Sequence, residues 1–167
     1  AYEIYQCDWS SDVCSSDLAD LYKELMQKYG FFINVLEKFT TSYKDDNIKL
    51  LPYVDSNKNY DAYCEYIKSN EKRRSTILFF LMLMKRDILP KEYIVDLCMK
   101  YITILLDQID QEEFTNENDE YTEFVSIIVT NGKEALVGEC GFTEIVNRIE
   151  QLAAYRSEEH TSELQSH

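Results

Sequence analysis

The sequence predicts an all-α protein, and two features of the pattern carry that prediction. Apolar residues recur every three or four positions along most of the chain, which places them on one face of an α-helix. Residues 77–84 are apolar without interruption and have basic residues on both sides. Such a run can also be a buried strand, but its length and its basic flanks favour a helix.

The first two helices are expected on either side of Gly30, which forms the turn between them. Their apolar stripes have helical spacing and consist of Leu21, Leu25 and Tyr29, and then of Phe32, Val35, Leu36, Phe39 and Tyr43. Residues 44–59 are polar around a short apolar island and contain Pro52. This composition predicts a loop.

Two further helices are expected over residues 60–69 and 71–87. The second contains the apolar run, and because no polar face is left over two turns it must be packed on more than one side. A break follows at Leu89-Pro90, where Pro90 suits the first turn of the next helix.

The helix after Pro90 is amphipathic, so we expect it to be an outer partner of the buried helix. Its apolar face holds Ile94, Leu97, Cys98, Tyr101, Ile102 and Leu105. Residues 107–120 then predict an acidic loop. The next helix is expected to end at Asn131-Gly132, a common pair at helix C-termini. The last helix carries its apolar positions at Phe142, Ile145, Val146, Ile149 and Leu152.

Pairs of antiparallel helices, one buried and one amphipathic, predict a HEAT-like α-solenoid. A single pair cannot bury its own apolar face, so neighbouring pairs stack. A compact helical bundle is the alternative that periodicity leaves open. The last helix has no stop signal, and we expect the solenoid to be truncated at both ends.

The two ends of the chain differ in character from residues 19–155. Residues 8–18, DWSSDVCSSDL, and residues 156–167, RSEEHTSELQSH, resemble one sequencing-library adapter translated in its two strand senses. Residues 1–7 look like the outer part of that adapter. We therefore expect residues 1–18 and 156–167 to be adapter-derived, disordered and unpacked, with Trp9 and Leu164 outside the core, and we exclude them from functional arguments. A genuine Ser-rich tail is the alternative.

The composition of residues 19–155 restricts the chemistry. Arg156 and seven acidic residues fall in the two ends, which leaves 16 Lys+Arg against 24 Asp+Glu, a net charge of −8 compared with −14 for the whole chain. This acidity disfavours indiscriminate phosphate binding. The segment holds no His and no Trp, which argues against Ser-His or Cys-His catalysis and against a Cys/His zinc site. We expect no catalytic, cofactor or metal residues.

The cysteines of this segment indicate a reducing compartment. Cys64, Cys98 and Cys140 are odd in number, scattered and without a CxxC motif. No apolar run reaches about 18 residues, so no membrane span is expected. We expect a cytoplasmic monomer.

A family resemblance is carried by three segments in order: EKRRSTILFFLMLMKRDIL from residue 71, PKEYIVDLCMKYITILL from residue 90, and EYTEFVSIIVTNGKEAL from residue 120. Together they resemble the middle domain of eukaryotic translation initiation factor 4G. The opening ADLYKEL and FINVLEKF is similar to the family's first visible repeat. The buried helix departs from the family pattern, with Phe80, Leu81 and Met82 in place of Gly-Glu-Leu. The composition indicates a divergent protist or large-virus version.

The resemblance implies a translation initiation scaffold without enzymatic activity. It implies binding to the DEAD-box RNA helicase initiation factor 4A and contact with mRNA. A related middle-domain scaffold in nonsense-mediated decay, splicing or cap binding is the close alternative. The alternative of a different class is an all-α enzyme that uses one of the three cysteines without histidine, which requires a thiol of strongly lowered pKa.

Candidate binding residues are cations at two places. Lys72, Arg73 and Arg74 are expected at a helix N-terminus, where the helix dipole disfavours positive charge, and this indicates an acidic partner surface or RNA. Pairing with the acidic loop of the same chain is the structural alternative. Lys133, expected after a helix cap, is the fourth candidate. Lys85 and Arg86, at the other end of the helix expected over residues 71–87, where cations meet the dipole favourably, are expected to be structural.

Overall fold

The computed structural model describes residues 12–45 and 48–164, and their side chains over residues 15–45 and 48–154. These residues form six α-helices and one short 3-10 helix, and no strand occurs among them. The prediction of an all-α protein is therefore confirmed. The chain divides into two compact units, Ala1–Pro90 and Lys91–His167.

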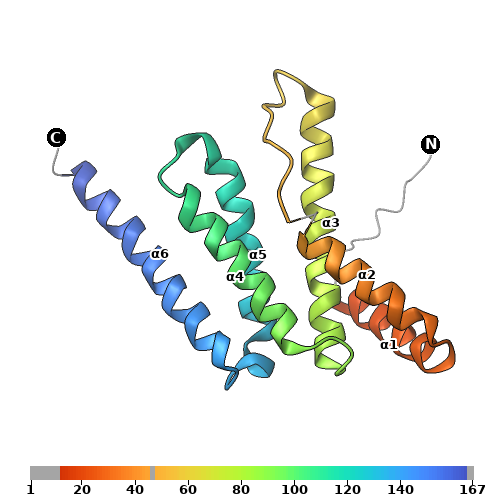
Figure 1. Cartoon of the computed structure of the whole chain (residues 1–167). Helices are drawn as coiled ribbons and strands as arrows, with labels where there is room; N and C mark the ends of the chain where they lie inside the picture. The colour runs from red at the N-terminus through yellow and green to blue at the C-terminus, as the bar shows by residue number, and fades with distance from the viewer. Residues whose placement is uncertain (1–11, 46–47, 165–167) are drawn as a thin grey trace. The chain divides into compact units, whose positions relative to one another are not determined.

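The first unit contains three helices (Figure 1). Helices α1 (Asp12–Lys28) and α2 (Phe31–Asp45) lie against the C-terminal half of α3 (Tyr60–Lys85). Gly30 lies in the turn between α1 and α2, as predicted. A long connection leads from α2 to α3, where a loop was predicted.

Aromatic contacts join α3 to both of its neighbours. Tyr22 of α1 meets Phe79 edge to face, with ring centroids 6.1 Å apart. Phe39 and Tyr43 of α2 lie against Phe80, with centroid distances of 5.5 and 5.1 Å. Because two successive residues of α3 contact different helices, the prediction that this helix is packed on more than one side is confirmed.

Helix α3 is one continuous helix, and the prediction of two helices over residues 60–69 and 71–87 is wrong. Its N-cap is Asn59, whose side-chain oxygen accepts a hydrogen bond from the backbone N–H of Ala62 at 3.1 Å. No glycine or proline interrupts the residues between, so nothing in the backbone stops the helix. The change from a polar to an apolar pattern is a change of environment within one helix.

The end of α3 is a Schellman motif. Asp87 donates its backbone N–H to Met84 O, and Ile88 donates to Leu83 O, both at 3.0 Å. Asp87 takes the left-handed position with φ of 57°. This position normally holds glycine, since other residues lose free energy there.

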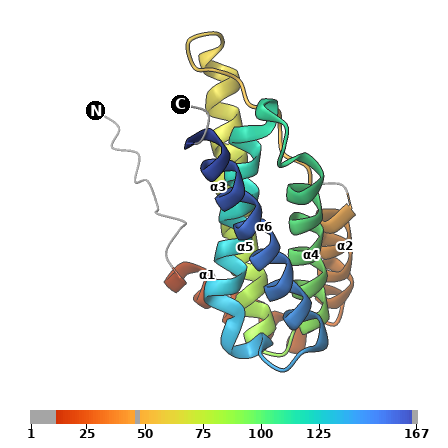
Figure 2. The same ribbon diagram turned by 90° about the vertical axis from the view of Figure 1, so that its left-hand side faces the viewer.

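The second unit contains α4 (Lys91–Gln108), the 3-10 helix η1 (Glu112–Phe114), α5 (Thr115–Leu136) and α6 (Cys140–Leu164). Helix α4 packs against both α5 and α6, and Figure 2 shows these helices side by side. The six residues predicted for the inner face of α4 are all buried.

Polar contacts and one close approach fix the ends of these helices. Gln108 Nε2 donates to Asn118 Oδ1 at 2.7 Å, which joins the end of α4 to the start of α5. Lys91 Nζ lies 3.2 Å from Glu139 Oε1. A Cβ atom on Gly141 would lie 2.4 Å from Val95 Cγ1, so α6 begins directly against the first turns of α4.

Two boundaries in the second unit differ from the predictions. The acidic loop over residues 107–120 is shorter than predicted, because α5 begins at Thr115. Helix α5 then continues through Asn131-Gly132 to Leu136, so that pair is not its C-terminal cap. Gly132 is buried within the helix, and the left-handed glycine after the helix is Gly138, with φ of 96°.

Parts of both adapter-like ends are helical rather than disordered. Helix α1 starts at Asp12 and α6 extends to Leu164, since each added residue of an existing helix costs little to order. Ser15 is buried, which differs from the expectation that this end is unpacked. Trp9 and the side chain of Leu164 lie outside the described residues. None of the described helices is both long and apolar enough to cross a membrane.

The close approach of Val95 to Gly141 predicts that adding one methyl group at position 141 lowers the stability of the protein. We expect Gly141→Ala to lower the free energy of unfolding by about 1–3 kcal/mol, because the new Cβ overlaps a stiff valine side chain. Urea denaturation followed by circular dichroism measures this. Gly30→Ala is the matched control, since nothing lies within 4 Å of its Cβ position, and equal losses in the two variants would contradict the steric explanation.

The left-handed Asp87 predicts a stabilising change. We expect Asp87→Gly to raise the free energy of unfolding by about 0.5–1 kcal/mol, because glycine adopts a positive φ without strain. Asp87→Ala is the control and should lower it, since alanine has neither the freedom of glycine nor the tolerance of aspartate. A decrease in stability for the glycine variant, seen in the same denaturation experiment, would refute this interpretation of the turn.

Candidate functional site

The predicted basic cluster lies in the middle of α3 and not at a helix N-terminus. The helix begins at Tyr60, about three turns before Lys72, Arg73 and Arg74. Because the dipole acts mainly on the first and last turns, it places no penalty on these cations. The electrostatic argument that pointed from this cluster to an acidic partner is therefore wrong.

The three cations differ in their surroundings. Arg73 Nη2 donates to the backbone carbonyl of Lys49 at 2.7 Å and so ties the loop before α3 to the helix. Arg73 and Arg74 are half-buried, whereas Lys72 is exposed. Lys72 is thus the member of the cluster most available to a partner, and Arg73 has a structural contact.

Lys133 is exposed on α5, within the helix and not after its cap. Its backbone carbonyl accepts a hydrogen bond from Val137 N–H at 2.9 Å, while its side chain faces solvent. It belongs to the second unit, and the other three candidates belong to the first. The four cations therefore do not form one cluster within a single unit.

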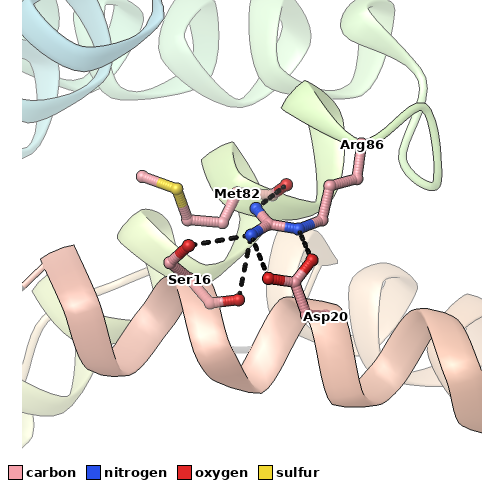
Figure 3. A network of polar contacts seen from close by, with 4 residues as sticks. All are labelled: Ser16, Asp20, Met82 and Arg86. Carbon is pink, nitrogen blue, oxygen red and sulfur yellow. Dashed lines mark hydrogen bonds and ion pairs between the residues drawn. The ribbon is translucent and has the colours of Figure 1, made fainter.

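A polar network links α1 to the end of α3 (Figure 3). Arg86 Nε donates to Asp20 Oδ1 at 2.5 Å, and Nη2 donates to Asp20 Oδ2 at 2.8 Å. Nη2 also donates to Ser16 Oγ at 2.8 Å, and Nη1 donates to the carbonyl of Met82 at 3.2 Å. Arg86 thus has the structural role expected for a cation at a helix C-terminus.

This network sets the ionisation of its members. The hydrogen bond from Arg86 lowers the pKa of the Asp20 carboxyl below its ordinary value, and the same bond raises the pKa of Arg86. The Asp20 side chain is 62% exposed, so solvent screens the attraction. The pair positions α1, and nothing in its geometry provides a substrate site.

The three cysteines of residues 19–155 differ in their surroundings. Burial raises the pKa of Cys98 to about 12, so this residue stays a neutral thiol near neutral pH. Cys64 is half-buried and Cys140 is exposed. Among the described residues, no group of three or more His, Cys, Asp or Glu side chains is placed to hold a metal ion.

An exposed apolar surface on α1 and α2 is the feature that the sequence pattern did not reveal as a site. Phe31 and Val35 of α2 are 59% and 48% exposed, and Leu21 of α1 is 52% exposed. Phe31 and Val35 are one helical turn apart and so share a face. The next turn of that face brings Phe39, also exposed, so three large apolar residues form a stripe.

The exposed stripe lies next to residues that pack α2 against α1. Phe31 stacks on Phe32 with ring centroids 4.5 Å apart, and Phe32 meets Tyr22 of α1 at 5.6 Å. Tyr22 also donates its hydroxyl to the carbonyl of Phe32 at 2.8 Å. The exposed rings are thus fixed to the folded core, and contiguous exposed apolar surface of this kind marks interaction sites.

Comparisons of the chain with protein-family models, curated proteins and solved structures gave no match.

The Arg86 network predicts a pH-dependent contribution to stability. Because the pKa of Asp20 is lowered in the folded protein, its contribution is present above the unfolded-state pKa and is lost as the pH falls through the folded-state value. We expect Asp20→Asn to lower the urea midpoint at neutral pH and to have no effect in acid. Glu24→Gln, which neutralises an exposed carboxylate on the same helix outside the network, is the control. A midpoint difference that persists undiminished at low pH would show that the ion pair is not its source.

Proposed function

We propose that this protein is a helical binding scaffold that acts by holding partner proteins. The observation that carries the proposal is the exposed apolar stripe of Phe31, Val35 and Phe39 on α2. Water contact with such a stripe is unfavourable by about 25 cal/mol per Å² of apolar surface, and a partner that covers it recovers that free energy. Aromatic residues on a rigid helix are frequent anchors at protein interfaces.

The family resemblance narrows the partner. Its three segments coincide with the second half of α3, with α4 and with α5. By that resemblance the protein is a translation initiation scaffold of the factor 4G middle-domain type, with helix pairs stacked as a HEAT-like solenoid in the cytoplasm. Its partner is then the DEAD-box helicase initiation factor 4A, with mRNA as a second ligand. Such a scaffold stimulates the helicase by favouring one arrangement of its lobes.

Binding of the whole chain to the helicase factor 4A tests this proposal. We expect the double variant Phe31→Ser, Val35→Ser to weaken binding by at least about tenfold, since central apolar anchors carry most of the binding free energy. Lys72→Glu and Lys133→Glu should each reduce it only a few-fold, because exposed charges contribute little. Isothermal titration calorimetry measures both effects.

The matched control is Ile33→Ser. Ile33 is 45% exposed and belongs to the same helix, but it lies two residues from both Phe31 and Val35 and therefore on another face. It should leave the affinity unchanged. A chain that is helical by circular dichroism but does not bind the helicase would refute the initiation reading and favour the relatives in decay, splicing or cap binding.

A further inference from the structure

Asn70 is an anomaly within α3. Its side chain is 0% exposed, and neither Nδ2 nor Oδ1 has a hydrogen-bond partner among the residues that the structure describes. An amide that is buried without partners loses its hydrogen bonds to water and gains nothing in return. Such groups are uncommon in folded proteins, and each one requires a physical explanation.

The turns that follow Asn70 contain further features that weaken a helix. Ser75 Oγ donates to the carbonyl of Glu71 at 3.0 Å, and Thr76 Oγ1 donates to the carbonyl of Lys72 at 2.8 Å. Bonds of this type to the residue four positions earlier compete with the backbone ladder and bend helices. Two such bonds in succession lie in the turns directly after Asn70.

The segments on either side of this stretch are anchored by buried side chains, whereas within it Arg73 bonds to the backbone carbonyl of Lys49. Upstream, Tyr66 is buried and meets Tyr53 of the preceding loop edge to face, with centroids 5.5 Å apart. Downstream, Ile77 begins the fully apolar run that packs against α1 and α2. Helix α3 thus consists of two fixed segments joined by a polar stretch that contains an unsatisfied amide.

We propose that Asn70 is a built-in break point of α3, at which the helix opens into two helices over residues 60–69 and 71–85. Asparagine is among the best N-cap residues, since its side-chain oxygen accepts a hydrogen bond from the backbone N–H two or three positions later. In the open form Asn70 caps the second helix through the N–H of Lys72 or Arg73. The amide that lacks partners in the continuous helix then has one.

The open form is a minor state, and the reason lies in the same residues. Opening removes the bonds that the N–H groups of residues 71–73 make within the helix, and one capping bond replaces only part of them. It also places Lys72, Arg73 and Arg74 in the first turn of a new helix, where the dipole disfavours positive charge. The continuous helix therefore predominates, and the break is a local opening beneath the global stability.

Amide hydrogen exchange on the whole chain tests this proposal. We expect the amides of residues 71–73 to exchange at least about tenfold faster than those of residues 64–67 and of residues 79–82, because they open without global unfolding. In Asn70→Leu the cap is lost and the buried polar group is removed, so protection of residues 71–73 should rise about tenfold. Asn70→Ala should also raise the protection of residues 71–73, and it serves as the second variant if the larger leucine side chain does not fit.

Asn70→Asp and Asn147→Leu complete the test. Aspartate keeps the ability to cap but is costlier to bury, so it should speed exchange of residues 71–73 further. Asn147 is exposed on α6, and its replacement should leave these amides unchanged. Two results would overturn the proposal: uniform protection along α3, or exchange of residues 71–73 that is slowed by neither Asn70→Leu nor Asn70→Ala. Either result would show that the buried amide is satisfied in the continuous helix.

Discussion

The need to cover the apolar run of α3 determines the arrangement of the first unit. Ile77, Phe80 and Leu81 are fully buried, and each contributes roughly 1.5–3 kcal/mol through removal from water. The buried residues of the whole run 77–84 surround the helix axis, so no single neighbouring helix can cover them. Helices α1 and α2 therefore approach α3 from different sides, through Phe79 on one side and Phe80 on the other. The Arg86 network fixes α1 in that position with directional bonds that apolar packing does not supply.

The second unit also buries the apolar face of a central helix, α4. The inner face of α4 is buried along its whole length, and the helix is covered by α5 and α6. A side chain at position 141 would overlap the side chain of Val95, so glycine there allows α6 to pack closely on α4. Gly132 is likewise buried inside α5.

These roles explain which parts of the structure the sequence could predict. Periodicity identified every buried residue of α4 except Val95, because burial on one face leaves a regular pattern. The sequence pattern gave wrong helix boundaries at residue 70 within α3 and at Asn131-Gly132 within α5. A change of composition resembles a boundary in the first case, and Gly132 resembles a cap in the second, although it is buried within α5. Whether a polar residue or a glycine ends a helix depends on tertiary contacts that no local pattern contains.

The candidate site was less predictable than the fold for the same reason. The argument from Lys72, Arg73 and Arg74 depended on a helix start that lies elsewhere, and the bond from Arg73 to Lys49 joins residues that are distant in sequence. The apolar stripe of α2 illustrates the general limit. The stripe predicted for this helix includes Val35 and Phe39 as well as Leu36 and Tyr43, and periodicity shows them as one face. Only the folded structure shows that α3 covers Tyr43 while Phe31 and Val35 stay exposed. When the apolar face of a helix is wider than one neighbouring helix can cover, part of that face stays exposed and is available to a partner. The sequence shows how wide the apolar face is, but only the folded structure shows which part of it is exposed.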